Sequence, residues 1–129
     1  MAQIFIDAST KQSPLHSACG IVLKMDDKQI EYGEYLGAVD NHIAEWQSLI
    51  IGVKLAIEHQ CQTLLIKSDS KIVVDSIDKN FVKHSQYKRY LDEYNKLITY
   101  FDLVIINWVP RQQNKHADTI ARRTLQHYL

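Results

Sequence analysis

The stretch from Asn41 to Gln60 carries apolar residues at helical spacing, and it divides the chain into two unlike parts. Its apolar positions are Ile43, Trp46, Ile50, Val53 and Ile57. Because these side chains fall on one side of a helix, that side must pack against another element. Only strand-like segments precede this helix, whereas strands and helices are mixed after it. The pattern predicts an α/β domain in which helices cover one mixed sheet.

The strand-like segments before the helix are Ile4–Asp7, Ala18–Met25 and Gln29–Leu36. Residues 26–28 predict a hairpin turn between the second and the third of them. After the long helix we predict a strand at Thr63–Lys67, helices at Ser70–Asp78 and Tyr87–Phe101, a strand at Leu103–Val109 and a closing helix at Lys115–Tyr128. The predicted order of elements is therefore β-β-β-α-β-α-α-β-α.

The chain has 129 residues, enough for one domain that buries a core without disulfides. Hydrophobic residues make up 46% and charged residues 23%, a composition that excludes a disordered chain. No apolar run is long enough to cross a bilayer, and the N-terminal residues do not resemble a secretion signal. We therefore expect a cytoplasmic protein without membrane association. Cys19 and Cys61 lack metal-binding spacing and are expected to be reduced thiols.

The net charge of zero conceals an uneven distribution of charged residues. Residues 1–70 contain five Lys/Arg and nine Asp/Glu, whereas residues 71–129 contain ten Lys/Arg and six Asp/Glu. The neutral total argues against a nucleic-acid partner. The distribution, however, allows an acidic cluster beside a basic face, which suits a metal-dependent enzyme that acts on a polyanion.

Two carboxylates follow predicted strands. Asp7 comes after the apolar residues of the segment QIFIDAST, and Asp69 comes shortly after the strand TLLIK. Taken alone, Asp7 could be a turn residue and Asp69 a helix N-cap. In an open α/β sheet, however, sites form beyond the carboxyl ends of neighbouring strands. If these two strands are neighbours, both carboxylates reach the same crevice.

Two further carboxylates lie near the starts of helices. Glu45 lies about 40° from Leu49 around the helix axis, so it borders the apolar stripe. Asp118 is close in angle to Leu125, at the edge of the apolar face of the last helix. Taken alone, Glu45 could be a surface residue and Asp118 a complement to the helix dipole. Four carboxylates in one crevice would need compensation, which Mg²⁺ supplies because it prefers carboxylate oxygens.

Four segments together resemble type 1 ribonuclease H: IFIDAST, DNHIAEWQSLIIGVKLAI, LLIKSDSKIVVDSI and VPRQQNKHADTIARR. They occur in the order of the family and extend over nearly the whole chain. The resemblance implies a single ribonuclease H-like domain over residues 1–129, with a five-stranded mixed sheet of order 3-2-1-4-5. It implies a short form of the enzyme, without the basic protrusion that some relatives use to grip their substrate.

By this resemblance, Asp7, Glu45, Asp69 and Asp118 are the catalytic and metal-binding residues, and two Mg²⁺ ions are the cofactor, with Mn²⁺ as an alternative. The family hydrolyses the RNA strand of RNA–DNA hybrids with a metal-activated water. Recognition of a hybrid depends on its shallow minor groove and its 2′-hydroxyl groups. The residues expected to contact the hybrid are Ser9, Asn41, His42, Ser70, Lys71 and Arg111.

Several positions depart from the family pattern. The loop Pro110–Asn114 is short and lacks the histidine that better-known bacterial relatives carry there. Arg111 cannot act as a general base at neutral pH, but it can stabilise phosphate charge. His116 lies two residues before the last aspartate and does not share its helix face. Ala8 replaces a usual glycine, and Asp40 stands where a threonine often helps to hold phosphate.

The leading hypothesis is a monomeric, metal-dependent endoribonuclease that cleaves the RNA strand of RNA–DNA hybrids. One alternative is a nuclease with another preferred substrate, such as double-stranded RNA or branched DNA. A second alternative is a ribonuclease H-like module that binds nucleic acid with little or no cleavage. The complete carboxylate set favours a nuclease, whereas the missing histidine and the neutral net charge keep the binding module open.

Overall fold

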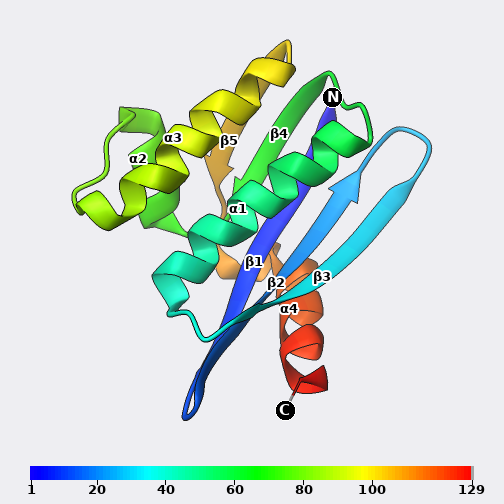
Figure 1. Cartoon of the computed structure of the whole chain (residues 1–129). Helices are drawn as coiled ribbons and strands as arrows, with labels where there is room; N and C mark the ends of the chain where they lie inside the picture. The colour runs from blue at the N-terminus through cyan, green and yellow to red at the C-terminus, as the bar shows by residue number, and fades with distance from the viewer. Residues whose placement is uncertain (129) are drawn as a thin grey trace.

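The computed structural model describes residues 1–128, which form a five-stranded mixed sheet with four α-helices packed around it (Figure 1). The strands are β1 (Ala2–Gln12), β2 (Leu15–Lys24), β3 (Gln29–Gly37), β4 (Thr63–Ser68) and β5 (Leu103–Trp108). The helices are α1 (Asn41–Glu58), α2 (Lys71–Lys79), α3 (Lys88–Leu97) and α4 (Lys115–His127). The strands lie in the order β3-β2-β1-β4-β5, which confirms the predicted topology.

The first strand is longer than predicted. We expected it to end at Asp7, but β1 continues to Gln12 because β2 pairs with it antiparallel as far as Gln12 and Leu15. Only the parallel pairing between β1 and β4 ends where the sequence indicated, at the pair Ile6 and Ser68. The predicted end of the strand is therefore right for the pairing of β1 with β4 and wrong for its pairing with β2.

The third predicted helix is shorter than expected. The sequence indicated one helix over Tyr87–Phe101, but α3 ends at Leu97 and a 3₁₀ turn follows it at Ile98–Tyr100. The apolar side chains of the segment still pack as predicted, since Tyr90, Leu91 and Tyr94 are buried. The change in helix type leaves this packing face unaffected.

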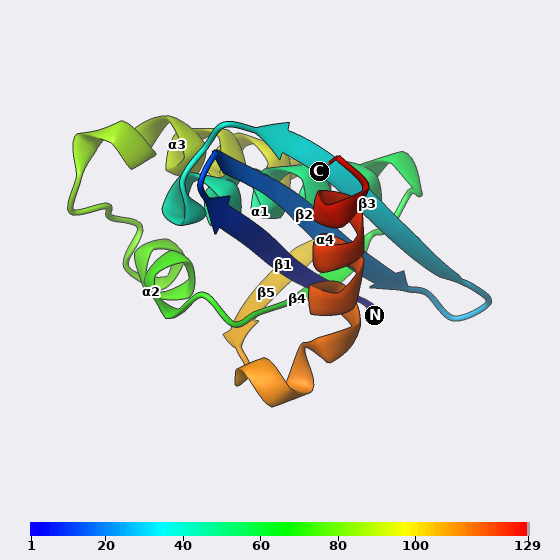
Figure 2. The ribbon, with the colours of Figure 1, turned by 90° about the horizontal axis from the view of Figure 1, so that it is seen from below.

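The two faces of the sheet are covered differently. α1 and α3 lie on one face, where the side chains of β1 and β4 form a core with those of α1 (Figure 1). The fully buried members of this core include Ile4, Leu49, Val53, Leu64 and Ile66. α4 packs on the opposite face, across β1, β2 and β3 (Figure 2). The main hydrophobic core therefore fixes α1 against the centre of the sheet, while α4 is held separately.

α4 rests directly on the backbone of β2 at Gly20. A Cβ atom at Gly20 would overlap the carbonyl oxygen of Ala117 and would lie 2.5 Å from the backbone nitrogen of Ala121. Gly20 is also the register partner of Asp7 across the β1–β2 ladder. Because directly opposed residues share a face of the sheet, the absent side chain lets the first turns of α4 bring Asp118 towards Asp7.

Two further sequence expectations concern membranes and cysteines. No helix within residues 1–128 combines the length and apolarity needed to cross a bilayer. Cys19 is buried, Cys61 is half-buried, and both are free thiols, as expected. Burial raises the pKa of the Cys19 thiol to about 12, so this group stays protonated at neutral pH.

We predict that Gly20→Ala lowers the free energy of unfolding by about 3 kcal/mol, because backbone atoms of α4 would have to move to admit the new methyl group. Urea unfolding measures this loss. Gly33→Ala is the matched control, since its Cβ would meet side-chain atoms of Thr124 and Ile120 rather than backbone. We expect a smaller loss for the control. A Gly20→Ala protein as stable as the wild type would contradict this account of α4 packing.

Candidate active site

The candidate site lies where β1 and β4 separate. Their last parallel pair is Ile6 and Ser68, and the next residue on each strand path is a carboxylate, Asp7 or Asp69. β4 ends there and the chain turns towards α2, whereas β1 continues along β2. The divergence of the two backbones leaves both side chains at the edge of an open crevice, as the sequence predicted.

A cavity of about 290 Å³ occupies this crevice. Its walls come from β1, α1, the end of β4, the end of β5 and the loop before α4. The lining residues are Asp7, Ala8, Asn41, Glu45, Asp69, Trp108 and Arg111. Three of the four predicted metal-binding carboxylates therefore share one cavity with two of the predicted substrate-contact residues.

Asp7 is the most strongly perturbed carboxylate of the cluster. Burial, followed by repulsion from Asp69 and Asp118, raises the pKa of Asp7 from its ordinary value of 3.8 to about 8. A hydrogen bond of 2.9 Å from the Ala8 backbone N–H to Asp7 Oδ1 acts in the opposite direction and lowers this pKa. The fold therefore holds Asp7 where its negative charge is costly unless a cation is present.

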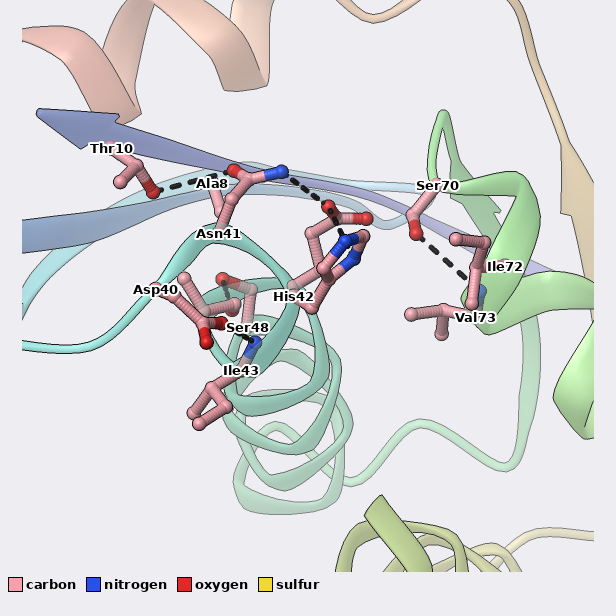
Figure 3. Close-up of polar contacts among 12 residues, drawn as sticks. Ala8, Thr10, Asp40, Asn41, His42, Ile43, Ser48, Ser70, Ile72 and Val73 are labelled. Atoms are coloured by element: carbon pink, nitrogen blue, oxygen red, sulfur yellow. Dashed lines mark hydrogen bonds and ion pairs between the residues drawn. The ribbon is translucent and has the colours of Figure 1, made fainter. Parts of the chain in front are cut away.

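Glu45 is positioned by its neighbours on α1 and β1. Asn41 Nδ2 donates to Glu45 Oε1 at 2.6 Å, and Thr10 Oγ1 donates to Asn41 Oδ1 at 3.3 Å, so a chain of contacts runs from β1 to the carboxylate (Figure 3). Burial raises the pKa of Glu45, and hydrogen bonding to the Ser70 side chain lowers it. These contacts hold Glu45 facing the crevice.

Asp118 enters the cluster from the opposite side of the sheet, on α4. It forms an ion pair with Arg122 one turn later, with Arg122 Nε 3.1 Å from each carboxylate oxygen. The start of α4 is tied to the end of β1 by Asn114, whose buried Nδ2 donates to the Ile6 carbonyl oxygen at 2.9 Å. Asp118 thus faces Asp7 but already has a cationic partner.

The predicted substrate-contact residues divide into two groups. Asn41 and Arg111 line the cavity, and Ser70 stands beside it as the N-cap of α2, where its Oγ accepts from the Val73 backbone N–H (Figure 3). The alternative in which Asp69 caps that helix is therefore wrong. His42 is exposed on the first turn of α1, with Nδ1 4.0 Å from Glu45 Oε1.

The remaining predicted contacts lie outside the cavity lining. Ser9 is half-buried on β1, two residues beyond Asp7, and Lys71 is exposed at the first position of α2. Two of the positions that depart from the family pattern, His116 and Asp40, make contacts of their own. His116 Nε2 lies 2.7 Å from Glu31 Oε2 on β3, so this contact holds the His116 ring at the surface. Asp40 is the N-cap of α1, where its Oδ1 accepts from the Ile43 backbone N–H at 2.9 Å. The carboxylate that replaces a usual threonine therefore has a structural function.

Sequence reasoning missed three residues that shape the site. Gly20 admits α4, Asn114 joins α4 to β1, and Trp108 forms part of the cavity wall. Their contacts join segments far apart in the chain, so spacing alone could not reveal them. The one local signal was Trp108 itself, a large aromatic residue at the end of a strand, shortly before the Pro110–Asn114 loop.

The donor set is chemically suited to a hard divalent cation, because all four predicted ligands are carboxylates. Within residues 1–128, no three Asp, Glu, His or Cys side chains are gathered closely enough to hold a metal ion in their present positions. An open arrangement is compatible with Mg²⁺, which keeps several waters and uses few protein carboxylates. A bound cation would also relieve the repulsion between carboxylates that raises the pKa of Asp7.

Comparison with known proteins places the chain in a family. Residues 5–124 match the reverse transcriptase-like family. EbsB of Enterococcus faecalis is 45% identical over 130 residues, which cover 99% of this chain and 96% of EbsB. Ribonuclease HI of Halobacterium salinarum and the bifunctional protein Rv2228c of Mycobacterium tuberculosis are each 27% identical. The matches span only 62% and 33% of the lengths of these last two proteins.

Solved structures agree with the sequence relatives. The crystal structure of ribonuclease H1 from Halobacterium salinarum superposes with a TM-score of 0.90 at 26% identity and covers 98% of both chains. The N-terminal ribonuclease H domain of Rv2228c gives a TM-score of 0.89 at 25% identity, covering 98% of this chain and 94% of that one. LC11-RNase H1, solved in complex with an RNA/DNA hybrid, shares the fold with a TM-score of 0.88 at 17% identity over 99% of both chains.

The sheet order, the family match over residues 5–124 and the superposition on the halobacterial enzyme all point to the same group of proteins. The chain belongs to the reverse transcriptase-like family and has the fold of type 1 ribonuclease H.

Proposed function

We propose that this chain is a metal-dependent endoribonuclease that hydrolyses the RNA strand of RNA–DNA hybrids. The observation that carries the proposal is the placement of Asp7, Glu45 and Asp69 in the walls of one cavity, with Asp118 close enough to repel Asp7, within a ribonuclease H fold. A domain without catalytic use for such a cluster would gain stability by replacing one of its carboxylates. The names of the halobacterial and mycobacterial relatives, both ribonucleases H, support the same substrate class.

Asp7, Glu45, Asp69 and Asp118 would hold the cofactor, for which we propose two Mg²⁺ ions, with Mn²⁺ as an alternative. When bound, a pair of such ions activates a water for in-line attack and stabilises the leaving oxygen of the phosphodiester. The protein contributes position: Asn41 orients Glu45, and the Ala8 N–H orients Asp7. Release of Asp118 from Arg122 would free both carboxylate oxygens to face the crevice.

The remaining side chains would bind the hybrid. Arg111, in the cavity wall, supplies a permanent positive charge for a phosphate group next to the reacting one. We propose Ser9, Asn41, His42, Ser70 and Lys71 as further contacts to the sugar–phosphate backbones. The monomeric state and the cytoplasmic location also stay predictions.

Two observations favour the alternative of a binding module with little cleavage. The Asp118 carboxylate is engaged with Arg122 through both oxygens, and the adjoining loop carries Arg111 in place of a histidine. If Arg122 competes effectively with the cofactor, the chain would bind hybrids and cleave them slowly. A direct assay of cleavage distinguishes the two functions.

We predict that the purified protein cleaves the RNA strand of a labelled RNA–DNA hybrid in Mg²⁺ or Mn²⁺, and that chelation of the metal abolishes cleavage. Asp7→Asn should lower the rate by at least about 100-fold, because it removes a charge that the cofactor requires. Asp92→Asn is the control: Asp92 is an exposed carboxylate paired with Lys88 on α3, and its loss should leave the rate unchanged.

The substrate panel for this assay contains the hybrid, double-stranded RNA, double-stranded DNA, branched DNA and single strands. Preferential cleavage of double-stranded RNA or branched DNA would show that the hybrid is not the preferred substrate, but it would leave the proposed metal site in place. Binding without cleavage of any substrate would contradict the nuclease function and support the binding module.

The third prediction concerns stability in a chelator. Because the folded-state pKa of Asp7 is raised from 3.8 to about 8, the proton that Asp7 holds stabilises the fold fully below about pH 4. This stabilisation is lost as the pH rises towards 8. Asp7→Asn carries no charge to lose, so at pH 8 its melting temperature should exceed that of the wild type by at least about 4 °C. Near pH 4 the difference should vanish.

Addition of Mg²⁺ at pH 8 should raise the melting temperature of the wild type and have less effect on Asp7→Asn, since a cation that binds only the folded state stabilises it. A pH-independent difference between the two proteins, or equal responses to Mg²⁺, would contradict the assignment of Asp7 to a cation site.

A further inference from the structure

Trp108 occupies a position that the function described so far does not explain. It is the last residue of β5, and its side chain forms part of the wall of the 290 Å³ cavity together with Asp69 and Arg111. It is 48% exposed, although tryptophan is usually largely buried. Other large apolar side chains are exposed in the part of the chain described, but Trp108 is the one among them that lines this cavity.

The indole ring is fixed by a hydrogen bond to the segment that carries Asp69. Trp108 Nε1 donates to the backbone carbonyl oxygen of Asp69 at 3.2 Å. The bond joins β5 to the turn between β4 and α2, 39 residues apart in the chain. It acts beside the main-chain contact in which the Val109 N–H donates to the Ser68 carbonyl oxygen. The ring is therefore anchored at one edge, and part of its surface stays open to solvent.

The surroundings of the exposed ring indicate what it would contact. Arg111, in the same cavity wall, offers positive charge, while the carboxylates Asp7, Glu45 and Asp69 form the rest of the lining. A flat apolar surface beside a guanidinium group suits a sugar–phosphate backbone, because the ring can pack on the sugar while the guanidinium binds the phosphate. An RNA–DNA hybrid presents such a backbone on both strands.

We propose that Trp108 has two separable roles, in positioning Asp69 through its indole N–H and in contacting a sugar of the bound hybrid through its exposed ring. The inference rests on the proposed function and adds to it a determinant of substrate affinity that the four carboxylates do not supply. The two roles depend on different parts of one side chain, so two substitutions separate them.

The experiment compares the wild type with Trp108→Phe and Trp108→Ala. Phenylalanine keeps an aromatic ring but has no N–H donor, whereas alanine has neither. Tyr100→Ala is the control, because Tyr100 is a 72% exposed aromatic residue that precedes the opposite end of β5. Thermal unfolding of each variant is recorded first, so that a loss of fold is recognised before binding and rates are compared.

Affinity for a labelled hybrid is measured by fluorescence anisotropy in a chelator, where no cleavage is expected. Trp108→Phe should bind as tightly as the wild type, whereas Trp108→Ala should bind about tenfold more weakly because it has no ring to pack on the sugar. Cleavage is then measured in Mg²⁺ with saturating hybrid. Trp108→Phe should lower kcat by about fivefold at unchanged KM, the effect of one neutral hydrogen bond.

The possible results separate this proposal from the proposed function. Wild-type protein that binds the hybrid but does not cleave it overturns the nuclease function, while the affinities still test the ring contact. Affinities of Trp108→Ala and Tyr100→Ala that both equal the wild type overturn the ring contact. A kcat of Trp108→Phe equal to the wild type overturns the positioning role. Absence of hybrid binding by the wild type overturns both proposals.

Discussion

The carboxylate of Asp7 lies where two other carboxylates repel it and where burial weakens its contact with water. This crowding of like charge is the constraint on which the other features of the site depend. Three of the four carboxylates in the cluster have a polar partner from the protein: the Ala8 N–H for Asp7, Asn41 for Glu45 and Arg122 for Asp118. These partners reduce the cost of the cluster without removing it, since the pKa of Asp7 stays raised to about 8. A divalent cation would complete the compensation.

The fold holds the cluster together through contacts that lie outside it. Gly20, opposite Asp7 in the ladder, lets α4 approach the sheet, and Asn114 joins the start of α4 to the end of β1. Together with the buried apolar side chains of α4, these contacts fix the position of Asp118 relative to Asp7. On the other face, the core beneath α1 fixes the helix that carries Glu45. The site therefore combines residues from both faces of the sheet. They meet where β1 and β4 diverge, so the end of the β1–β4 pairing decides the geometry of the site.

Much of this arrangement could be predicted from the sequence. Helical spacing located α1, and the resemblance to type 1 ribonuclease H gave the strand order and the four carboxylates. The end of β1 could not be predicted, because its continuation to Gln12 depends on pairing with β2 rather than on its own residues. The choice of Ser70 over Asp69 as helix cap depended on where β4 stops. The contacts of Trp108 with Asp69 and of Asn114 with Ile6 join distant segments and leave no periodic pattern in the chain.

The central claim is that these carboxylates form a divalent cation site. Diffraction from crystals grown with Mn²⁺, recorded at a wavelength where manganese scatters anomalously, tests it directly. The account predicts an anomalous peak within coordination distance of Asp7, in contact with at least one of Glu45, Asp69 and Asp118, and no such peak in crystals of Asp7→Asn. Fully occupied manganese bound elsewhere, with an empty crevice in the wild-type protein, would contradict it.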